Sequence, residues 1–256
     1  MFNYIKSELY RLTHSYALYM VGFAFVIAPV IVNILLYCLA YVDSNFPYAT
    51  TTYSYSNVVA SPMIFCYAAL FMVFVFYEGN KKNGNLKNVI CTGLSREKIF
   101  LGQIVVCLFV SAAMLFCTII IYIISAQLLL KVVGPVTAMD LVIESLVMIP
   151  IAISSLILSI FIVNYFDKGS TGIIYWLCIM IFVPQVLFYI SLVIEPVRGI
   201  AMWLPQNFLS GMQVNQTVCA PIWNTADGLA KCLISGFIGI VVFSIYGIVS
   251  LRKKEF

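Results

Sequence analysis

Charge is rare along this chain, and that scarcity constrains the fold more than any other feature. Of the 256 residues, 63% are hydrophobic and 9% are charged, whereas a water-soluble domain averages roughly 45–50% apolar and about 25% charged residues. A soluble core cannot cover so much apolar surface. Continuous apolar runs, rather than short alternating segments, favour helices over a membrane barrel. We therefore expect an all-α integral membrane protein.

A transmembrane helix needs about 20 apolar residues, and six uncharged stretches meet this length. They lie within 15–41, 58–77, 99–130, 141–166, 171–194 and 232–251. Four of them contain a proline, namely Pro29, Pro62, Pro150 and Pro184, and proline can kink a membrane helix. The sequence thus predicts one transmembrane domain of six spans over residues 1–256.

The basic residues predict the orientation of these spans. If both termini are cytoplasmic, eleven of the fourteen Lys and Arg residues face the cytoplasm, and only Lys131, Arg198 and Lys231 face outward. Cytoplasmic loops of membrane proteins carry such an excess of Lys and Arg. We therefore expect a multi-pass protein with both termini in the cytoplasm.

The first 14 residues predict a separate helix on the inner membrane surface. Apolar side chains recur there at helical spacing, with polar and basic residues such as Lys6 and Arg11 between them; the apolar set is Phe2, Ile5, Leu9 and Leu12. This pattern is typical of an amphipathic interface helix, and the alternative is a plain polar tail. The following apolar run is too long for a signal peptide and lacks a small-x-small cleavage site.

The segment 78–98 gathers the densest charge of the chain. Its charged residues are Glu78, Lys81, Lys82, Lys87, Arg96, Glu97 and Lys98. Within it Leu86, Val89 and Ile90 are spaced i, i+3 and i+4, so a short helix would present an apolar edge to the cytosol. That edge suggests a docking element for a soluble partner. The alternative is a solvated basic loop attracted only to anionic lipid headgroups.

The segment 195–231 lies between the fifth and sixth spans. Its residues 199–226 carry no charge, yet they do not form a clean apolar span. It holds Pro205 and Pro221 and two tryptophans, Trp203 and Trp223, a residue type suited to the membrane interface. We predict two short helices that lie in or dip into the outer leaflet; an irregular surface loop is the alternative.

Several classes of site have no sequence support. The eight cysteines lie mostly in or beside apolar spans, there is no Cys-x-x-Cys, and His14 is the only histidine, so neither a disulfide framework nor a metal site is expected. There is no Gly-x-x-x-x-Gly-Lys-Ser/Thr loop for nucleotide phosphates. Glu144 and Glu195 lie near outer span ends without a carboxylate partner. We predict no catalytic site, no metal, no bound cofactor and no nucleic-acid partner.

Neutral polar residues within the spans are the remaining candidates for a substrate path. They are Asn33, Thr118, Gln127, Ser155, Asn164 and Gln185. The alternative is that each forms a hydrogen bond between helices. The second, third, fifth and sixth spans carry no charge, which argues against an ion-coupled carrier.

The interface helix, the six spans and the long outer segment together resemble the ABC-2 type permeases of ATP-binding-cassette transporters. The charged loop adds to this likeness. Glu78 ends the second span, Gly84 and Lys87 follow, and Gly93-Leu-Ser-Arg96 precedes Gly102-Gln103. This is similar to the family's Glu…Gly…Gly-x-Ser-Arg…Gly-Lys signature, with Gln103 in place of the usual lysine.

The resemblance implies a membrane subunit that pairs with a second permease, identical or similar, and with two copies of a cytosolic ATPase that binds ATP and Mg²⁺. The ATPase would contact the loop through Glu78, Lys81, Lys82, Leu86, Lys87, Val89, Ile90, Gly93 and Arg96. Lys6 and Arg11 would add a second contact. Glu78 and Arg96 would fix the loop to the span ends as a charge pair, unless both are solvated interface charges.

In size and general organisation, the chain looks closest to small bacterial permeases of bacteriocin immunity and peptide-toxin export. The location that this resemblance implies is a bacterial plasma membrane. An aromatic-rich bundle with uncharged walls favours a hydrophobic or amphipathic substrate such as a peptide. The alternatives are an exporter of a lipid or small-molecule drug, and a membrane sensor or scaffold that transports nothing.

Overall fold

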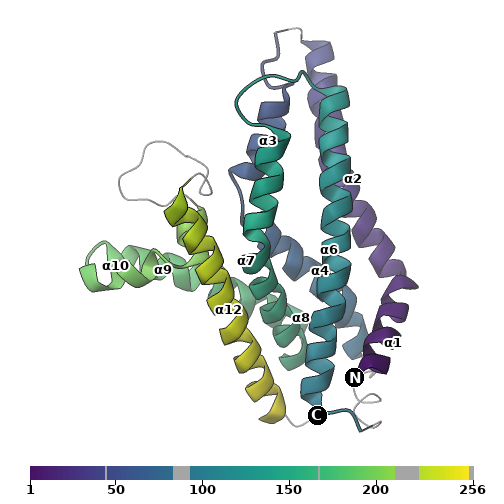
Figure 1. Cartoon of the computed structure of the whole chain (residues 1–256), viewed down its shortest axis with the longest axis vertical. Coiled ribbons are helices and arrows are strands. Elements are labelled where there is room, and N and C mark those ends of the chain that lie inside the picture. The colour runs from purple at the N-terminus through teal and green to yellow at the C-terminus, as the bar shows by residue number, and fades with distance from the viewer. Residues whose placement is uncertain (44, 83–92, 167, 211–224, 254–256) are drawn as a thin grey trace.

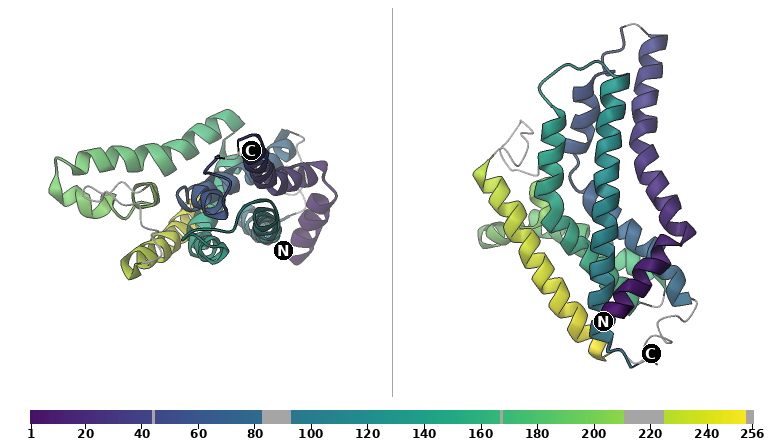
Figure 2. Two further views of the ribbon diagram at one scale, coloured as in Figure 1. Left: turned by 90° about the horizontal axis from the view of Figure 1, so that it is seen from above. Right: turned by 45° about the vertical axis from the view of Figure 1, so that its right-hand side comes forward.

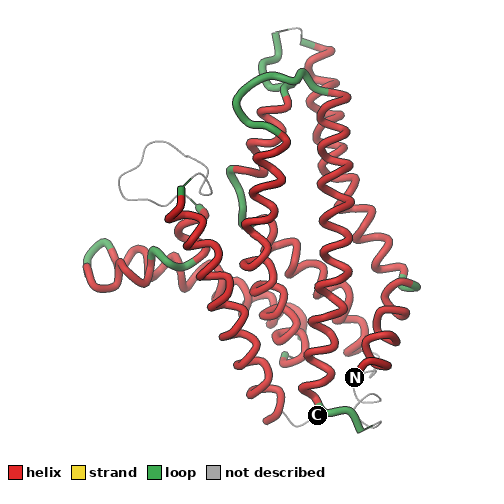
Figure 3. The backbone as a smooth tube through the Cα atoms, in the orientation of Figure 1, coloured by secondary structure: helices red, strands yellow, loops and turns green. Residues whose placement is uncertain are grey.

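The computed structural model of this chain describes residues 1–43, 45–82, 93–166, 168–210 and 225–253, and these ranges are almost entirely helical (Figure 3). The helices are α1 Phe2–Thr13, α2 Tyr16–Val42, α3 Thr51–Val59, α4 Ile64–Lys82, α6 Arg96–Leu129, α7 Ala138–Tyr165, α8 Gly169–Leu177, α9 Val183–Ser191, α10 Glu195–Ala201, α11 Pro205–Leu209 and α12 Ala226–Lys253. The only extended pairing within the described ranges is an isolated bridge between Thr50 and Lys131. The prediction of an all-α protein is confirmed.

Five stretches of helix are long and apolar enough to cross a membrane: Tyr16–Val42, Arg96–Leu129, Ala138–Tyr165, Gly169–Ser191 and Ala226–Arg252. They coincide with five of the six predicted spans. The protein is therefore an α-helical multi-pass membrane protein in character. Its outward side chains fit this environment, because large apolar residues such as Phe23, Phe109 and Phe237 are more than half exposed.

The second predicted span differs from the expected unbroken helix. Instead of one helix from Val58 to Tyr77, α3 ends at Val59 and α4 begins at Ile64, and the two meet at an angle of 70°. Pro62 lies in the break, where it has no amide hydrogen to donate and disfavours helical backbone in the residue before it. Counted as one bent span, this pair brings the total to six.

Helix α7 lies at the centre of the bundle, with α4 and α12 packed along it (Figures 1 and 2). Its side chains Ile151, Leu158 and Ile162 are almost completely buried. Small residues let α12 approach closely: a Cβ added to Gly236 would lie 2.5 Å from Pro150 Cβ, and one added to Gly239 would lie 2.8 Å from Ser154 Cβ. Such small-residue contacts are the usual way in which membrane helices pack.

The fifth predicted span is a helix interrupted by a wider turn. Between α8 and α9, residues Cys178–Phe182 form a π-helical turn, which ends just before Pro184 in the first turn of α9. A proline cannot donate the usual helical hydrogen bond, and its ring clashes with a carbonyl of the preceding turn. The extra residue in the π-helical turn relieves this clash. After this turn α9 and α10 extend sideways from the bundle (Figures 1 and 2).

Two short helices follow the fifth predicted span, as expected: α10 and α11. Asn207 of α11 is fully buried and donates its side-chain amide to the carbonyls of Pro184 and Ala201, both at 2.8 Å. These bonds fasten the short helices to α9. The prediction that they lie in the outer leaflet stays a prediction.

The bundle has two distinguishable ends. The beginning of α1 and the end of α12 lie at one of them (Figures 1 and 2), together with the end of α4 and the beginning of α6. We call this the terminal end. The opposite end holds the last turns of α2 and α6, the short helix α3 and the first turns of α7 (Figure 1).

Candidate functional site

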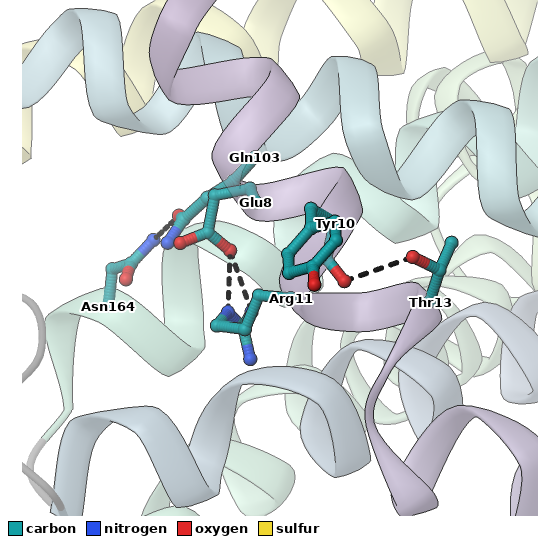
Figure 4. Close-up of polar contacts among 6 residues, drawn as sticks. All are labelled: Glu8, Tyr10, Arg11, Thr13, Gln103 and Asn164. Atoms are coloured by element: carbon teal, nitrogen blue, oxygen red, sulfur yellow. Dashed lines mark hydrogen bonds and ion pairs between the residues drawn. The ribbon is translucent and has the colours of Figure 1, made fainter.

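The N-terminal amphipathic helix is present as α1 and packs against α6 and α2 at the terminal end. Leu12 is fully buried and Tyr4 nearly so, Ile5 and Leu9 pack against the core, and Phe2 is exposed. The polar face carries an ion pair in which Arg11 donates from Nε at 3.1 Å and from Nη2 at 2.6 Å to Glu8 Oε2 (Figure 4). The sequence prediction of a helix at this place is confirmed.

Arg11 also contacts the end of the neighbouring helix α4. Its guanidinium carbon lies 5.7 Å from the centre of the Tyr77 ring, within the range of a cation–π interaction. Tyr77 is buried and directly precedes Glu78, the first residue of the charged loop. The interface helix is thus attached beside the point where that loop begins.

A second attachment joins α1 to the first turns of α6. The Tyr4 ring lies so close to Gly102 that a Cβ at that position would come within 2.7 Å of Tyr4 Cδ1. Only glycine permits this approach. Burial in the contact raises the pKa of the Tyr4 hydroxyl above its ordinary value. The interface helix therefore touches helices on both sides of the charged loop.

Gln103, the residue after Gly102, continues the contact into the bundle. Its side-chain carbonyl accepts a hydrogen bond of 2.6 Å from Asn164 Nδ2 of α7 (Figure 4). Both side chains are buried. A lysine at this position would place an ammonium group in a buried site. The glutamine instead forms a neutral bond between α6 and α7.

The beginning of α6 is joined to the end of α12. Arg96 Nη1 donates to the carbonyl of Leu251 at 3.3 Å, and Glu97 forms an ion pair with Arg252. Gly93, in the turn before α6, has a φ of 83°, a left-handed conformation that favours glycine. These contacts fix where the charged loop enters α6.

The structure places only part of the predicted ATPase contact. Lys6 is exposed on α1 and Arg11 is half-buried. Leu86, Lys87, Val89 and Ile90 lie outside the described residues, as do the side chains of Glu78, Lys81 and Lys82. The docking edge and the Glu78–Arg96 charge pair therefore stay predictions.

The opposite end holds a buried network of neutral polar groups. Asn33 of α2 donates to Ser125 Oγ of α6 at 2.8 Å and accepts from Ser54 Oγ of α3 at 2.6 Å. Tyr122 of α6 in turn donates from its hydroxyl to the Ser54 carbonyl at 2.6 Å. All four side chains are buried. The network joins three helices, including the short helix α3 of the bent pair.

The predicted path residues do not gather in one place. Asn33 and Asn164 belong to two different networks, and Ser155 of α7 donates to the Cys66 carbonyl of α4 at 3.0 Å. Thr118 and Gln185 are half-buried, and Gln127 is exposed. For Asn33, Ser155 and Asn164 the contacts are the hydrogen bonds between helices that were the alternative prediction.

Sequence reasoning missed the burial of Glu144. The sequence predicts a position near an outer span end, yet Glu144 is fully buried in α7, and neither carboxyl oxygen has a hydrogen-bond partner among the described residues. The sequence offers one indication of this burial, because Glu144 shares a helical face with the apolar residues Leu141, Met148 and Ile151. Whether that face is enclosed, however, depends on the helices that pack against α7.

Within the described ranges, no group of three or more His, Cys, Asp and Glu side chains is arranged to hold a metal ion. His14 is exposed and stacks on Tyr10, with ring centres 4.1 Å apart. No family model, curated protein or solved structure matches this chain.

Proposed function

We propose that this chain is the membrane-spanning subunit of an ATP-binding-cassette transporter, and that it exports a hydrophobic or amphipathic substrate such as a peptide. A separate cytosolic ATPase, in two copies, would bind ATP and Mg²⁺ and supply the energy. A second permease subunit, identical or similar, would complete the pathway through a bacterial plasma membrane.

One observation carries this proposal most directly. The two segments predicted to contact an ATPase, the interface helix and the charged loop, belong to the same end of the bundle. Arg11 of α1 touches Tyr77 at the start of the loop, and Tyr4 touches Gly102 just after its end. A movement of the loop would therefore be passed both to α1 and to the spans α4 and α6.

The contacts at the beginning of α6 extend this connection. Arg96 and Glu97 bind the last turn of α12, and Gln103 binds Asn164 of the central helix α7. An ATPase that pulled on the loop would act on α6, α7 and α12 together. A movement of packed helices between two arrangements would transmit ATP hydrolysis in the cytosol to the substrate path through the membrane.

Affinity purification of the tagged chain from its own cells, followed by mass measurement, tests this function. We expect a complex of two permease subunits with two nucleotide-binding subunits that hydrolyse ATP. A stable and functional monomer without any nucleotide-binding partner would contradict the proposal and favour a sensor or scaffold.

The orientation has its own test, by cysteine labelling from outside intact cells. The excess of Lys and Arg, eleven of fourteen, supports a cytoplasmic location for the 78–98 loop and for both termini. We expect an impermeant thiol reagent to label a cysteine introduced at Tyr48 but none introduced at Gly93. Labelling of Gly93→Cys from outside would overturn the orientation and the docking argument with it.

A further inference from the structure

Glu144 is an acidic side chain in a place where acidic side chains are rare. It lies six residues after the first residue of α7, about 9 Å along the helix, and its exposed fraction is 0%. Among the residues that the structure describes, neither Oε1 nor Oε2 has a hydrogen-bond partner. The side chains of the neighbouring network, Asn33, Ser54, Tyr122 and Ser125, all form hydrogen bonds.

The hydroxyl groups around Glu144 do not neutralise it. Tyr122 lies close enough to interact electrostatically with Glu144, but its hydroxyl donates to the Ser54 carbonyl and accepts from Ser54 Oγ. Tyr55 stands edge-on to Tyr122, with ring centres 5.8 Å apart, and its buried hydroxyl has no partner. Ser145, next in sequence, donates to the Leu141 carbonyl.

No cation in the described ranges compensates the carboxyl either. The titratable or charged groups on the elements packed against this part of α7 are Tyr53 and Tyr55 of α3, Tyr122 of α6, and Asp227, Lys231 and Cys232 of α12. On α7 itself Asp140 lies one turn before Glu144, where it accepts hydrogen bonds from Thr137. Lys231, the cation among them, forms an ion pair of 2.7 Å with Asp227. The surrounding donor set is also too poor to hold a metal ion.

An ionised carboxylate enclosed in this way would lose its hydration and gain nothing in return, which strongly disfavours the charged form. The remaining way to neutralise the group is a proton. We propose that Glu144 is a proton-binding site, occupied in this conformation of the chain. The site is independent of the function proposed above, because it follows from the packing of the helices around α7 and not from the charged loop.

Proton binding at Glu144 is linked to the closure of the opposite end. Release of the proton leaves a carboxylate that needs water, and water reaches it only if the helices packed against this part of α7 separate. The bent pair α3–α4 is the element best placed to move, because α3 is short and is joined to the rest of the second span by a break. Protonation therefore favours the closed packing, and deprotonation favours the open one.

Infrared spectroscopy of the purified, lipid-reconstituted full chain tests the proton directly. At neutral pH we expect a carbonyl stretching band of a protonated carboxylic acid in the wild-type chain, and its loss in Glu144→Gln. Glu195→Gln is the matched control, since Glu195 is exposed in α10, and it should leave the band unchanged. Absence of the band from the wild-type chain would overturn the proposal, whatever the variants do.

Thermal unfolding as a function of pH provides the second measurement. The unfolded chain releases this proton near the ordinary glutamate range, at about pH 4, whereas the folded chain keeps it to higher pH. Wild-type stability should therefore be greatest below about pH 4, fall as the pH rises above that value, and stop falling once the folded chain also releases the proton. Glu144→Leu, which removes the unpartnered group, should fold and lose this dependence. A pH dependence equal to that of the wild type in Glu144→Leu would contradict the proposal.

Discussion

The two ends of the bundle are held together by different chemistry. At the terminal end charged side chains are paired and partly exposed: Glu8 with Arg11, and Glu97 with Arg252. At the opposite end the network around Asn33 is neutral and buried, and the carboxyl of Glu144 has no hydrogen-bond partner among the described residues. Paired charges at an aqueous boundary cost little to rearrange, whereas buried neutral bonds fix one arrangement.

The difference in chemistry between the two ends is compatible with two roles. At the terminal end the charged side chains can exchange their ion-pair partners, which suits a surface that contacts a soluble subunit. The opposite end changes only if a buried network opens, which suits a gate. The close contact between Tyr4 and Gly102 is the exception at the terminal end, because it depends on shape rather than charge.

The largest effect is therefore expected from Gly102→Val. The added side chain would meet the Tyr4 ring and force α1 away from α6, at a cost of about 2 kcal/mol in stability. Thermal unfolding in detergent, with limited proteolysis of α1, measures both consequences. Gly199→Val is the control, since nothing lies within 4 Å of a Cβ built at Gly199. A Gly102→Val chain with wild-type stability and a protected α1 would show that this contact is unimportant.

A smaller effect is expected from Asn33→Leu at the opposite end. The change removes two hydrogen bonds while Ser54 and Ser125 keep bonds to Tyr122, so we expect a loss of about 1 kcal/mol. Asn57→Leu is the matched control, because Asn57 is exposed and bonds only to Tyr53 one turn away. If both variants unfold at the same temperature, the buried network does not stabilise this end.

The smallest effect is expected from Arg252→Gln, which breaks the ion pair with Glu97. Both side chains are solvent-accessible, so the unfolding temperature should barely change, and any change should vanish at high salt. Lys231→Gln serves as the comparison, since it breaks a pair at the beginning of α12. A large, salt-insensitive loss from Arg252→Gln would show that the terminal end is fixed rather than exchangeable.

Much of the fold could be predicted from the sequence, because the lipid environment limits a long apolar run to a helix. The interface helix and five spans lie where the patterns placed them. The break between α3 and α4 at Pro62 was harder to predict from the sequence. Prolines also lie within the helices α2 and α7 without breaking them, so the proline alone does not distinguish a kink from a 70° bend.

The site was harder to predict because side-chain partners come from distant helices. Nothing in the sequence pairs Asn33 with Ser125, 92 residues later, or Asn164 with Gln103. A polar residue in a span is equally compatible with a path and with a bond between helices. Glu144 shows the same limit, since its burial depends on helices from distant parts of the chain that pack against α7.

The most direct test of the proposed function is recovery of the ATPase by two sets of loop variants. Changing Leu86 and Val89 to Asp should abolish recovery of the nucleotide-binding subunit, because the apolar edge would carry unpaired charge into the contact. Neutralising Lys81, Lys82 and Lys87 to Gln should weaken recovery much less. Membrane insertion of both sets should match the wild type. Undiminished recovery with the Asp pair, or loss only with the Gln set, would contradict docking through the loop.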